Sequence, residues 1–261
     1  MIRVGIGGWN FAPWKGTFYP KGLKAADELR YAGEHLTSIE INGTFYRTQS
    51  ADSFAKWRDE TPEGFVFSVK GHRAVVNRKV LAEAGEAIDW FYGSGLLALG
   101  DKLGPVLWQF APYKKFDPED FGAFLALLPK EKDGRPMRHV VEVRSSTFLV
   151  PQFVDLLRQH DVAVVYADSD EYPAIADVTA PFAYLRLQRT AEDIATGYSD
   201  ADLDRWADRA KALAAGGTPD DLVRFHPDPA AKDERDVYVY MIAGAKVRAP
   251  AAAMALIERV D

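Results

Sequence analysis

The feature that most constrains the fold is a series of eight short apolar segments, most of which are followed by a stretch with helical features. Each segment has the length and composition of a buried strand. Strands that alternate with helices in a chain of 261 residues predict a (β/α)8 TIM-like barrel, with an open doubly wound sheet as the alternative. The predicted strands cover residues 3–8, 38–41, 65–70, 106–110, 139–144, 162–168, 182–188 and 237–242.

The segments between the predicted strands carry helix signals, with one exception. Ser50 is placed to cap a helix over 50–60, and Asp117-Pro118 is a strong start for another. Residues 171–181 have no helical pattern, so the helix between strands six and seven is expected to be missing or very short. The stretch 216–236 is polar and contains proline, which predicts a long excursion. No domain boundary is visible, so we expect one domain over 1–261. The other predicted helices cover 24–36, 77–99 with a break near 93–95, 151–160, 199–214 and 251–260.

Charge and cysteine content exclude several classes of function. The formal net charge of −6 argues against broad binding to nucleic acid or to an anionic membrane. The absence of cysteine removes disulfides, thiolate nucleophiles and cysteine-based zinc sites, and is compatible with a reducing compartment. The chain begins directly with a strand pattern, and no apolar run approaches the roughly 20 residues of a membrane helix. We therefore expect a soluble, cytoplasmic protein; its oligomeric state is left open.

No cofactor or metal site is predicted. The segment 5–8 leads into an aromatic loop and not into a helix, so the glycine-rich dinucleotide fingerprint is absent, as is the Walker phosphate loop. The chain shows no spaced set of His, Asp and Glu ligands. Ser68 has no evident histidine partner for a hydrolase triad.

The predicted strand at 38–41 offers the clearest sign of a binding cleft. Glu40 and Asn42 share one face, because side chains alternate along a strand. A carboxylate among apolar residues is costly to bury unless it is paired or used. Gly43 then allows a turn into the aromatic and cationic loop 44–47. These features indicate a cleft wall, and the alternative is an edge strand with Glu40 in water.

If the barrel is correct, the carboxyl-terminal ends of the strands meet at one mouth, where barrel enzymes keep their chemistry. Three cationic side chains expected there, Lys70, Arg144 and Arg186, suit the binding of a carboxylate or phosphate group. Three carboxylates are also expected there, those of Glu40, Glu142 and Asp168, and some of them must pair with the cations. A carboxylate left in apolar surroundings would have a raised pKa and could act as an acid. Paired carboxylates also suit glycoside chemistry, but the sequence does not give their separation. The residues expected at the mouth are Glu40, Asn42, Lys70, Gln109, Glu142, Arg144, Asp168 and Arg186.

These residues predict an enzyme of the hydrolase, lyase or isomerase type that acts on a small anionic, hydroxyl-bearing substrate, such as a phosphorylated or acidic sugar. The predicted catalytic residues are Glu40, Glu142 and Asp168. The alternatives are a binding protein without chemistry and, more weakly, a protein that processes nucleic acid. The residues predicted to bind substrate are Asn42, Tyr46, Lys70, Gln109, Arg144, Arg186 and Trp9.

A set of motifs resembles the YecE-like family, also known as domain of unknown function 72. The likeness runs in order from Gly5 to about Trp206. The resemblance implies a TIM-barrel-like fold and supplies no reaction. The motifs are Gly7-Gly8-Trp9, Tyr19-Pro20, Glu40-Ile41-Asn42-Gly43-Thr44-Phe45-Tyr46, Trp57, Thr61-Pro62, residues 65–70, Leu107-Trp108-Gln109-Phe110, Glu142-Val143-Arg144, Asp168-Ser169 and Tyr184-Leu185-Arg186-Leu187.

The sequence departs from the family pattern at several of these motifs. Ser145 and Phe148 stand where the resemblance leads us to expect His and Trp, and Gln188 stands in place of His. The last strand ends in residues 241–244, which include Ala243-Gly244, where Asn-rich sequence is usual. If the missing His and Asn side chains matter chemically, this protein has altered or lost that activity.

Overall fold

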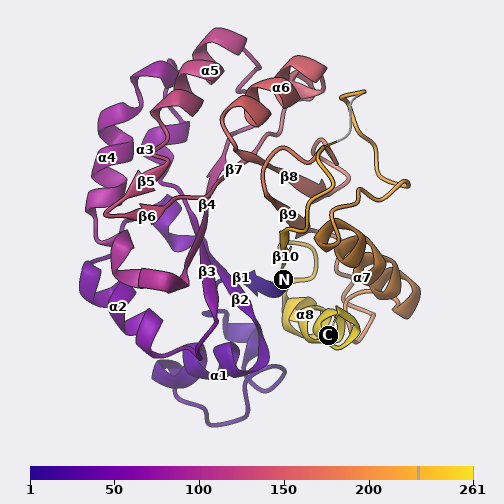
Figure 1. Cartoon of the computed structure of the whole chain (residues 1–261). Helices are drawn as coiled ribbons and strands as arrows, with labels where there is room; N and C mark the ends of the chain where they lie inside the picture. The colour runs from indigo at the N-terminus through magenta and orange to yellow at the C-terminus, as the bar shows by residue number, and fades with distance from the viewer. Residues whose placement is uncertain (228–229, 261) are drawn as a thin grey trace.

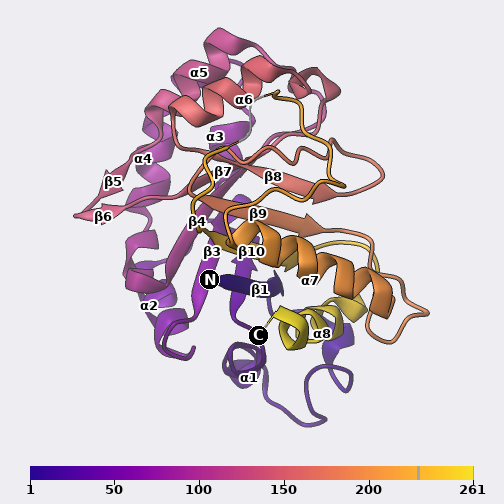
Figure 2. The same ribbon diagram turned by 45° about the vertical axis from the view of Figure 1, so that its right-hand side comes forward.

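A computed structural model describes residues 1–227 and 230–260 (Figures 1 and 2). Eight parallel strands close into a barrel in the order β1-β10-β9-β8-β7-β4-β3-β2. The closure confirms the (β/α)8 barrel and excludes the open doubly wound sheet. The strands are β1 Ile2–Gly7, β2 Ser38–Ile41, β3 Val66–Lys70, β4 Leu103–Gln109, β7 His139–Glu142, β8 Ala163–Asp168, β9 Phe182–Leu187 and β10 Asp236–Met241, and a small hairpin is formed by β5 Glu131–Lys132 and β6 Arg135–Pro136.

The helices lie around the outside of the barrel, and α7 and α8 lie next to each other (Figure 1). The predicted caps form: Ser50 Oγ accepts a hydrogen bond from the amide of Ser53, and the Asp117 carboxylate accepts two. The expected helix over 77–99 is broken more often than predicted, and Gly95 adopts a left-handed φ of 109° at the last break. The helices are α1 Glu28–His35, α2 Ala51–Asp59, α3 Arg73–Val76, α4 Gly85–Gly93, α5 Pro118–Leu127, α6 Pro151–Gln159, α7 Asp200–Ala214 and α8 Ala249–Val260.

No helix joins β8 to β9, which confirms the prediction for the segment after strand six. Instead, residues 169–181 run along the barrel in irregular form and bury Ile175 and Val178. The carboxylate of Asp177 accepts hydrogen bonds from the amides of Phe225 and His226, at 2.8 and 3.1 Å. These hydrogen bonds hold the polar excursion between α7 and β10 against the segment 169–181, which takes the place of the missing helix. Two residues of the predicted stretch 216–236, at 228–229, lie outside the described residues.

The interior of the barrel is filled by large rings opposite small side chains. Tyr184 and Tyr240 pack at 5.0 Å between ring centroids, while β8 contributes alanines and a valine. A second, larger apolar core lies between the barrel and its helices. Within the part of the chain that the structure describes, no helix combines the length and apolar composition needed to cross a bilayer. The interior residues are Val66, Leu107, Val140, Ala163, Val165, Ala167, Phe182, Tyr184, Tyr238 and Tyr240.

His139 on β7 is buried in the outer core with both ring nitrogens engaged. Trp108 Nε1 can only donate, so His139 Nδ1 accepts this hydrogen bond at 3.1 Å. Nε2 therefore carries the proton and donates to the Pro129 carbonyl at 2.8 Å. Burial lowers the pKa of His139 to about 4, because a charged imidazolium would lose its hydration.

This histidine is expected to make the fold sensitive to mild acid. The folded-state pKa is depressed, so the stabilisation is complete above the unfolded value near 6.5 and is lost as the pH falls toward 4. We expect the free energy of unfolding in urea to drop by about 2 kcal/mol between pH 7.5 and pH 5. His139→Gln, which can still accept from Trp108 and donate to Pro129, should flatten this dependence. An equal drop in that variant would show that other groups cause it.

Candidate active site at the barrel mouth

Two buried carboxylates lie at the mouth of the barrel with one guanidinium between them. Arg186 on β9 donates through Nη2 to Glu40 Oε1 at 3.0 Å and through Nη1 to Glu142 Oε2. The remaining oxygen of Glu40 accepts from the Tyr184 hydroxyl at 2.6 Å, and Asn42 Nδ2 donates to Oε1 at 2.9 Å. Strands β2, β7 and β9 are thus joined across the barrel by charge-assisted hydrogen bonds.

The network continues from Glu142 toward β3 and β4. Glu142 Oε1 accepts from Arg144 Nε at 2.7 Å and from Gln109 Nε2 at 2.8 Å. The amide oxygen of Gln109 then accepts from Lys70 Nζ at 2.6 Å. Seven of the predicted mouth residues, from five strands and the loops that follow them, therefore form one connected group.

The carboxylate of Glu142 is held in the ionised form by its partners. Burial alone would raise the pKa of Glu142, but the positive charges and hydrogen bonds of Arg186 and Arg144 outweigh burial and lower it. Likewise burial would lower the pKa of Arg186, and the carboxylates of Glu142 and Glu40 raise it instead. Glu142 is therefore poorly suited to donate a proton near neutral pH.

Lys70 is the cation of the network that lacks a carboxylate partner. Among the residues that the structure describes, no carboxylate oxygen lies within 4.0 Å of its Nζ. Its ammonium group lies 4.5 Å from the centroid of the Phe45 ring and, within residues 1–227 and 230–260, hydrogen-bonds only to the neutral amide of Gln109. Burial and the nearby Arg186 lower the pKa of Lys70 to about 8.

Asp168 lies apart from this network, because side chains alternate between the two faces of a strand. Ala167 pairs with Arg186 in the β8–β9 register and shares its inward face, so Asp168 at the end of β8 points to the opposite face. Its carboxylate accepts from the Tyr198 hydroxyl at 3.4 Å and lies 3.3 Å from Arg189 Nε. Burial raises its pKa. Asp168 was predicted to lie with Glu40 and Glu142, but among the described residues its carboxylate contacts neither of them.

Trp9 and Tyr46, the two aromatic residues predicted to bind substrate, lie outside the network. Trp9 packs edge-on against Trp57, with 4.9 Å between ring centroids, and against Phe67. Tyr46 is 67% exposed on the short turn that follows β2. Trp9 therefore helps to cap the core beside the barrel mouth, while Tyr46 is free to contact a molecule that approaches over the loop.

Three aromatic residues that touch the network were not among the predicted site residues. Tyr184 holds Glu40, Phe45 lies beside Lys70, and the ring of Tyr172 lies 4.1 Å from the Arg144 guanidinium carbon. Tyr184 could have been found, because it lies two residues before Arg186 on the same strand and so shares its inward face. Phe45 ends the short 3-10 turn 43–45, and Tyr172 lies in an irregular segment, so no periodicity in the sequence gives their side-chain directions.

Some of the positions that depart from the family pattern have structural roles of their own. Ser145 caps the short turn 146–148, and Phe148 is buried in a cluster of phenylalanine rings with Phe116 and Phe121. Gln188 Nε2 is buried without a hydrogen-bond partner among the described residues. Ala243 has a left-handed φ of 67°, and Gly244 follows with 61°. A side chain does not fit at Gly244, because a Cβ at this position would lie within 2.8 Å of Thr190 atoms.

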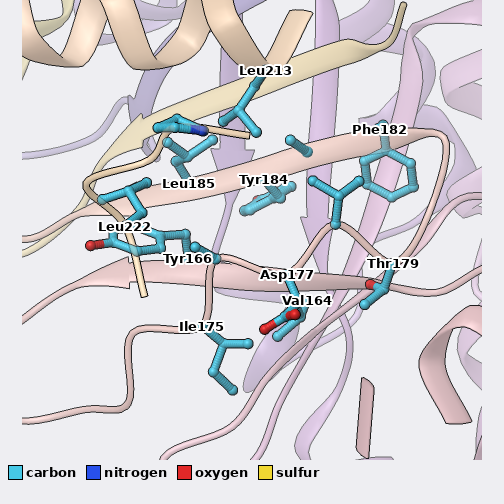
Figure 3. Close-up of a pocket in the computed structure, with 14 residues that line it drawn as sticks. Val164, Tyr166, Ile175, Asp177, Thr179, Phe182, Tyr184, Leu185, Leu213 and Leu222 are labelled. Carbon is cyan, nitrogen blue, oxygen red and sulfur yellow. The ribbon is translucent and has the colours of Figure 1, made fainter. Parts of the chain in front are cut away.

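A small apolar pocket outside the barrel wall is a separate feature. Figure 3 shows that side chains of β8 and β9, the segment 175–179, Leu213 and Leu222 surround it. Its volume, about 20 Å³ for the centre of a water-sized sphere, holds roughly one water and no substrate. Residues 1–227 and 230–260 also contain no group of three or more His, Asp or Glu side chains arranged to hold a metal ion. The connected charged side chains make the barrel mouth the best candidate site.

The fold and the site define a TIM-like α/β barrel with a charged, hydrogen-bonded mouth. A model of the family described as "Protein of unknown function DUF72" matches residues 3–261, and the chain belongs to this family. The UPF0759 protein YunF of Bacillus subtilis is 28% identical over 160 residues. That match spans 59% of this chain and about half, 55%, of the length of YunF.

Solved structures are similar over the whole fold. A DUF72 family protein from Enterococcus faecalis V583 has a TM-score of 0.72 at 16% identity and covers 100% of this chain and 95% of its own. Another, from Thermotoga maritima MSB8, has a TM-score of 0.70 at 23% identity and covers 98% and 97%. A xylose isomerase-like TIM barrel in a fusion protein is more distant, with a TM-score of 0.53 at 14% identity, over 95% of this chain and 41% of that one. At these identities the likeness shows the barrel fold alone.

Proposed function

We propose that this protein is an enzyme that binds a small anionic, hydroxyl-bearing molecule at the barrel mouth, such as a sugar phosphate or a sugar acid, and transfers protons on it. The observation that carries the proposal is the charge balance of the network. Three cations face two carboxylates there, so the network has a net charge of +1 while Lys70 is protonated. An anionic group of a substrate would neutralise that excess charge.

Arg144 is the best candidate to hold the anion. Its Nε is engaged with Glu142, its Nη1 lies 3.4 Å from the Tyr172 hydroxyl, and its Nη2 makes no hydrogen bond to the described residues. The side chain is 21% exposed, so the free edge of the guanidinium is accessible. Guanidinium groups bind carboxylate and phosphate strongly, because two N–H donors match two oxygens.

Lys70 is the proposed proton-transfer group. With its pKa lowered to about 8, it exchanges a proton near neutral pH, as a general acid or base must. In this proposal Glu40 and Glu142 orient the cations, and Gln109 and Asn42 orient hydroxyl groups. Asp168, on the opposite face of β8, has no role on the substrate.

A screen by thermal shift tests the proposal with matched pairs of ligands, such as glucose 6-phosphate against glucose and gluconate against sorbitol. At a hundredfold excess over Kd, an anionic ligand should stabilise the fold by about 2.7 kcal/mol, which raises Tm by roughly 5–10 °C. The uncharged partner should leave Tm unchanged, and Arg144→Met should abolish the shift. No response to any anion would overturn the proposal.

Chemistry is then separated from binding by product analysis of each hit. Lys70→Met removes the excess positive charge, so it should bind the anion more weakly through Arg144, and at saturating ligand it should lower turnover at least about 100-fold. The second candidate function, an anion-binding protein without chemistry, is favoured by the fact that every oxygen of Glu40 and Glu142 already accepts a hydrogen bond. Binding without any conversion by the wild-type protein would establish that alternative.

A further inference from the structure

Lys70 differs from the other cations of the mouth because the carboxylates are already occupied. The oxygens of Glu40 and Glu142 accept from amide, tyrosyl and guanidinium donors, and none of them pairs with Lys70. The partners of its Nζ are the neutral amide of Gln109 and the face of Phe45. A lysine beside other cations and without an anionic partner is the arrangement that makes an amine nucleophilic.

We propose that Lys70 forms an imine with an aldehyde or ketone carbon of the substrate, so that the substrate class is a small anionic carbonyl compound with hydroxyl groups. This inference rests on the proposed function and names the chemistry of the same site. Lys70 lies at the carboxyl end of β3, is partly buried at the mouth, and is connected to Arg144 through Gln109 and Glu142. In this proposal a small molecule held by Arg144 reaches its Nζ.

The step balances without any further reagent. The lone pair of the neutral amine attacks the carbonyl carbon, a C–N bond forms, and a proton moves from the nitrogen to the oxygen to give a neutral carbinolamine. The hydroxyl group then takes up the proton that the ammonium group released when it became the neutral amine. The C–O bond then breaks, water leaves, and the nitrogen lone pair forms the C=N bond. Counted from the ammonium form, lysine and carbonyl give an iminium ion and water, and the net charge of the site stays at +1. The iminium N–H can donate to Gln109 Oε1 as the ammonium does.

The charged groups that face Lys70 set the pH range of this reaction. Arg186 on β9 and Arg144 after β7 oppose its protonation, while Glu40 on β2 and Glu142 on β7 favour it. Burial is the largest cause, and together with the arginines it lowers the pKa of Lys70 to about 8. Roughly a tenth of the molecules then carry the neutral amine at pH 7, far more than for an ordinary lysine near 10.4.

Reductive trapping tests the proposal on the intact protein. Glyceraldehyde 3-phosphate and dihydroxyacetone phosphate are added separately with sodium cyanoborohydride at pH 7.5, and adducts are located by mass spectrometry of peptides. We expect one adduct per chain, on Lys70, at least tenfold above the labelling of Lys114. Lys114 is the matched control, since it is also partly buried but lies 3.7 Å from the Asp120 carboxylate.

Two variants and one general reagent complete the test. Lys70→Arg should lose the adduct, and Lys114→Arg should retain it. Trinitrobenzenesulfonate should modify Lys70 with a midpoint near pH 8, whatever the natural substrate is. Labelling spread over surface lysines, or equal labelling of Lys70→Arg, overturns the imine. If Lys70 stays unlabelled while anions raise Tm and Lys70→Met loses turnover, the imine is overturned and the proposed function stands.

Discussion

Replacing Arg186 with methionine is expected to lower the free energy of unfolding by about 3–5 kcal/mol. This side chain is fully buried and separates two carboxylates that are themselves buried, Glu40 and Glu142. Without the guanidinium, two like charges remain in the barrel interior with fewer donors to stabilise them. The expected loss in the free energy of unfolding exceeds the contribution of a single hydrogen bond, because a buried charge without a partner is far more costly than an exposed one.

Urea unfolding at pH 7 and pH 5 measures this effect and its cause. In Arg186→Met, Arg144 alone is left to oppose burial, so the pKa of Glu142 rises above its wild-type value. A raised folded-state pKa gives stability that is present at low pH and lost as the pH rises, so the deficit should be smaller at pH 5. Arg189→Met is the matched control, because Arg189 is half exposed and should contribute about 0–1 kcal/mol. Equal losses in the two variants would contradict a buried ion network.

Gly5→Ala is expected to destabilise the barrel by about 3 kcal/mol, near the upper end of what overpacking costs. Gly5 pairs with Ser38 across the β1–β2 ladder, and a Cβ at this position would lie 1.9 Å from the Ser38 carbonyl oxygen. That oxygen belongs to backbone and cannot rotate away. The two strands must therefore separate, which also displaces Glu40, whose carbonyl accepts from the Gly8 amide at 2.9 Å.

The comparison variant for Gly5→Ala is Gly43→Ala. No atom lies within 4 Å of a Cβ built on Gly43, and its φ is not in the left-handed region. We expect its free energy of unfolding to stay within about 0.5 kcal/mol of the wild type. Anion binding should be weakened in Gly5→Ala, since Glu40 moves. Normal stability of Gly5→Ala would show that β1 and β2 can part without loss.

Most of the barrel could be predicted from the sequence because its determinants are local. Strand segments were found by length and apolar composition, and helices by caps such as Ser50 and Asp117. The missing helix after β8 was found from the absence of a helical pattern in residues 171–181. The breaks within 77–99 were harder to predict, since short helical turns there depend on packing against neighbouring helices.

The sequence by itself determined which segments become strands and which polar side chains stand at their ends, because both follow from the order of residues along the chain. The tertiary structure decided how those side chains are paired. The register between β8 and β9 turned Asp168 to the outer face, and barrel closure brought Arg186 between Glu40 and Glu142. Lys70 was left without an anionic partner for the same reason, since distances between strands far apart in the chain are set only when the barrel closes.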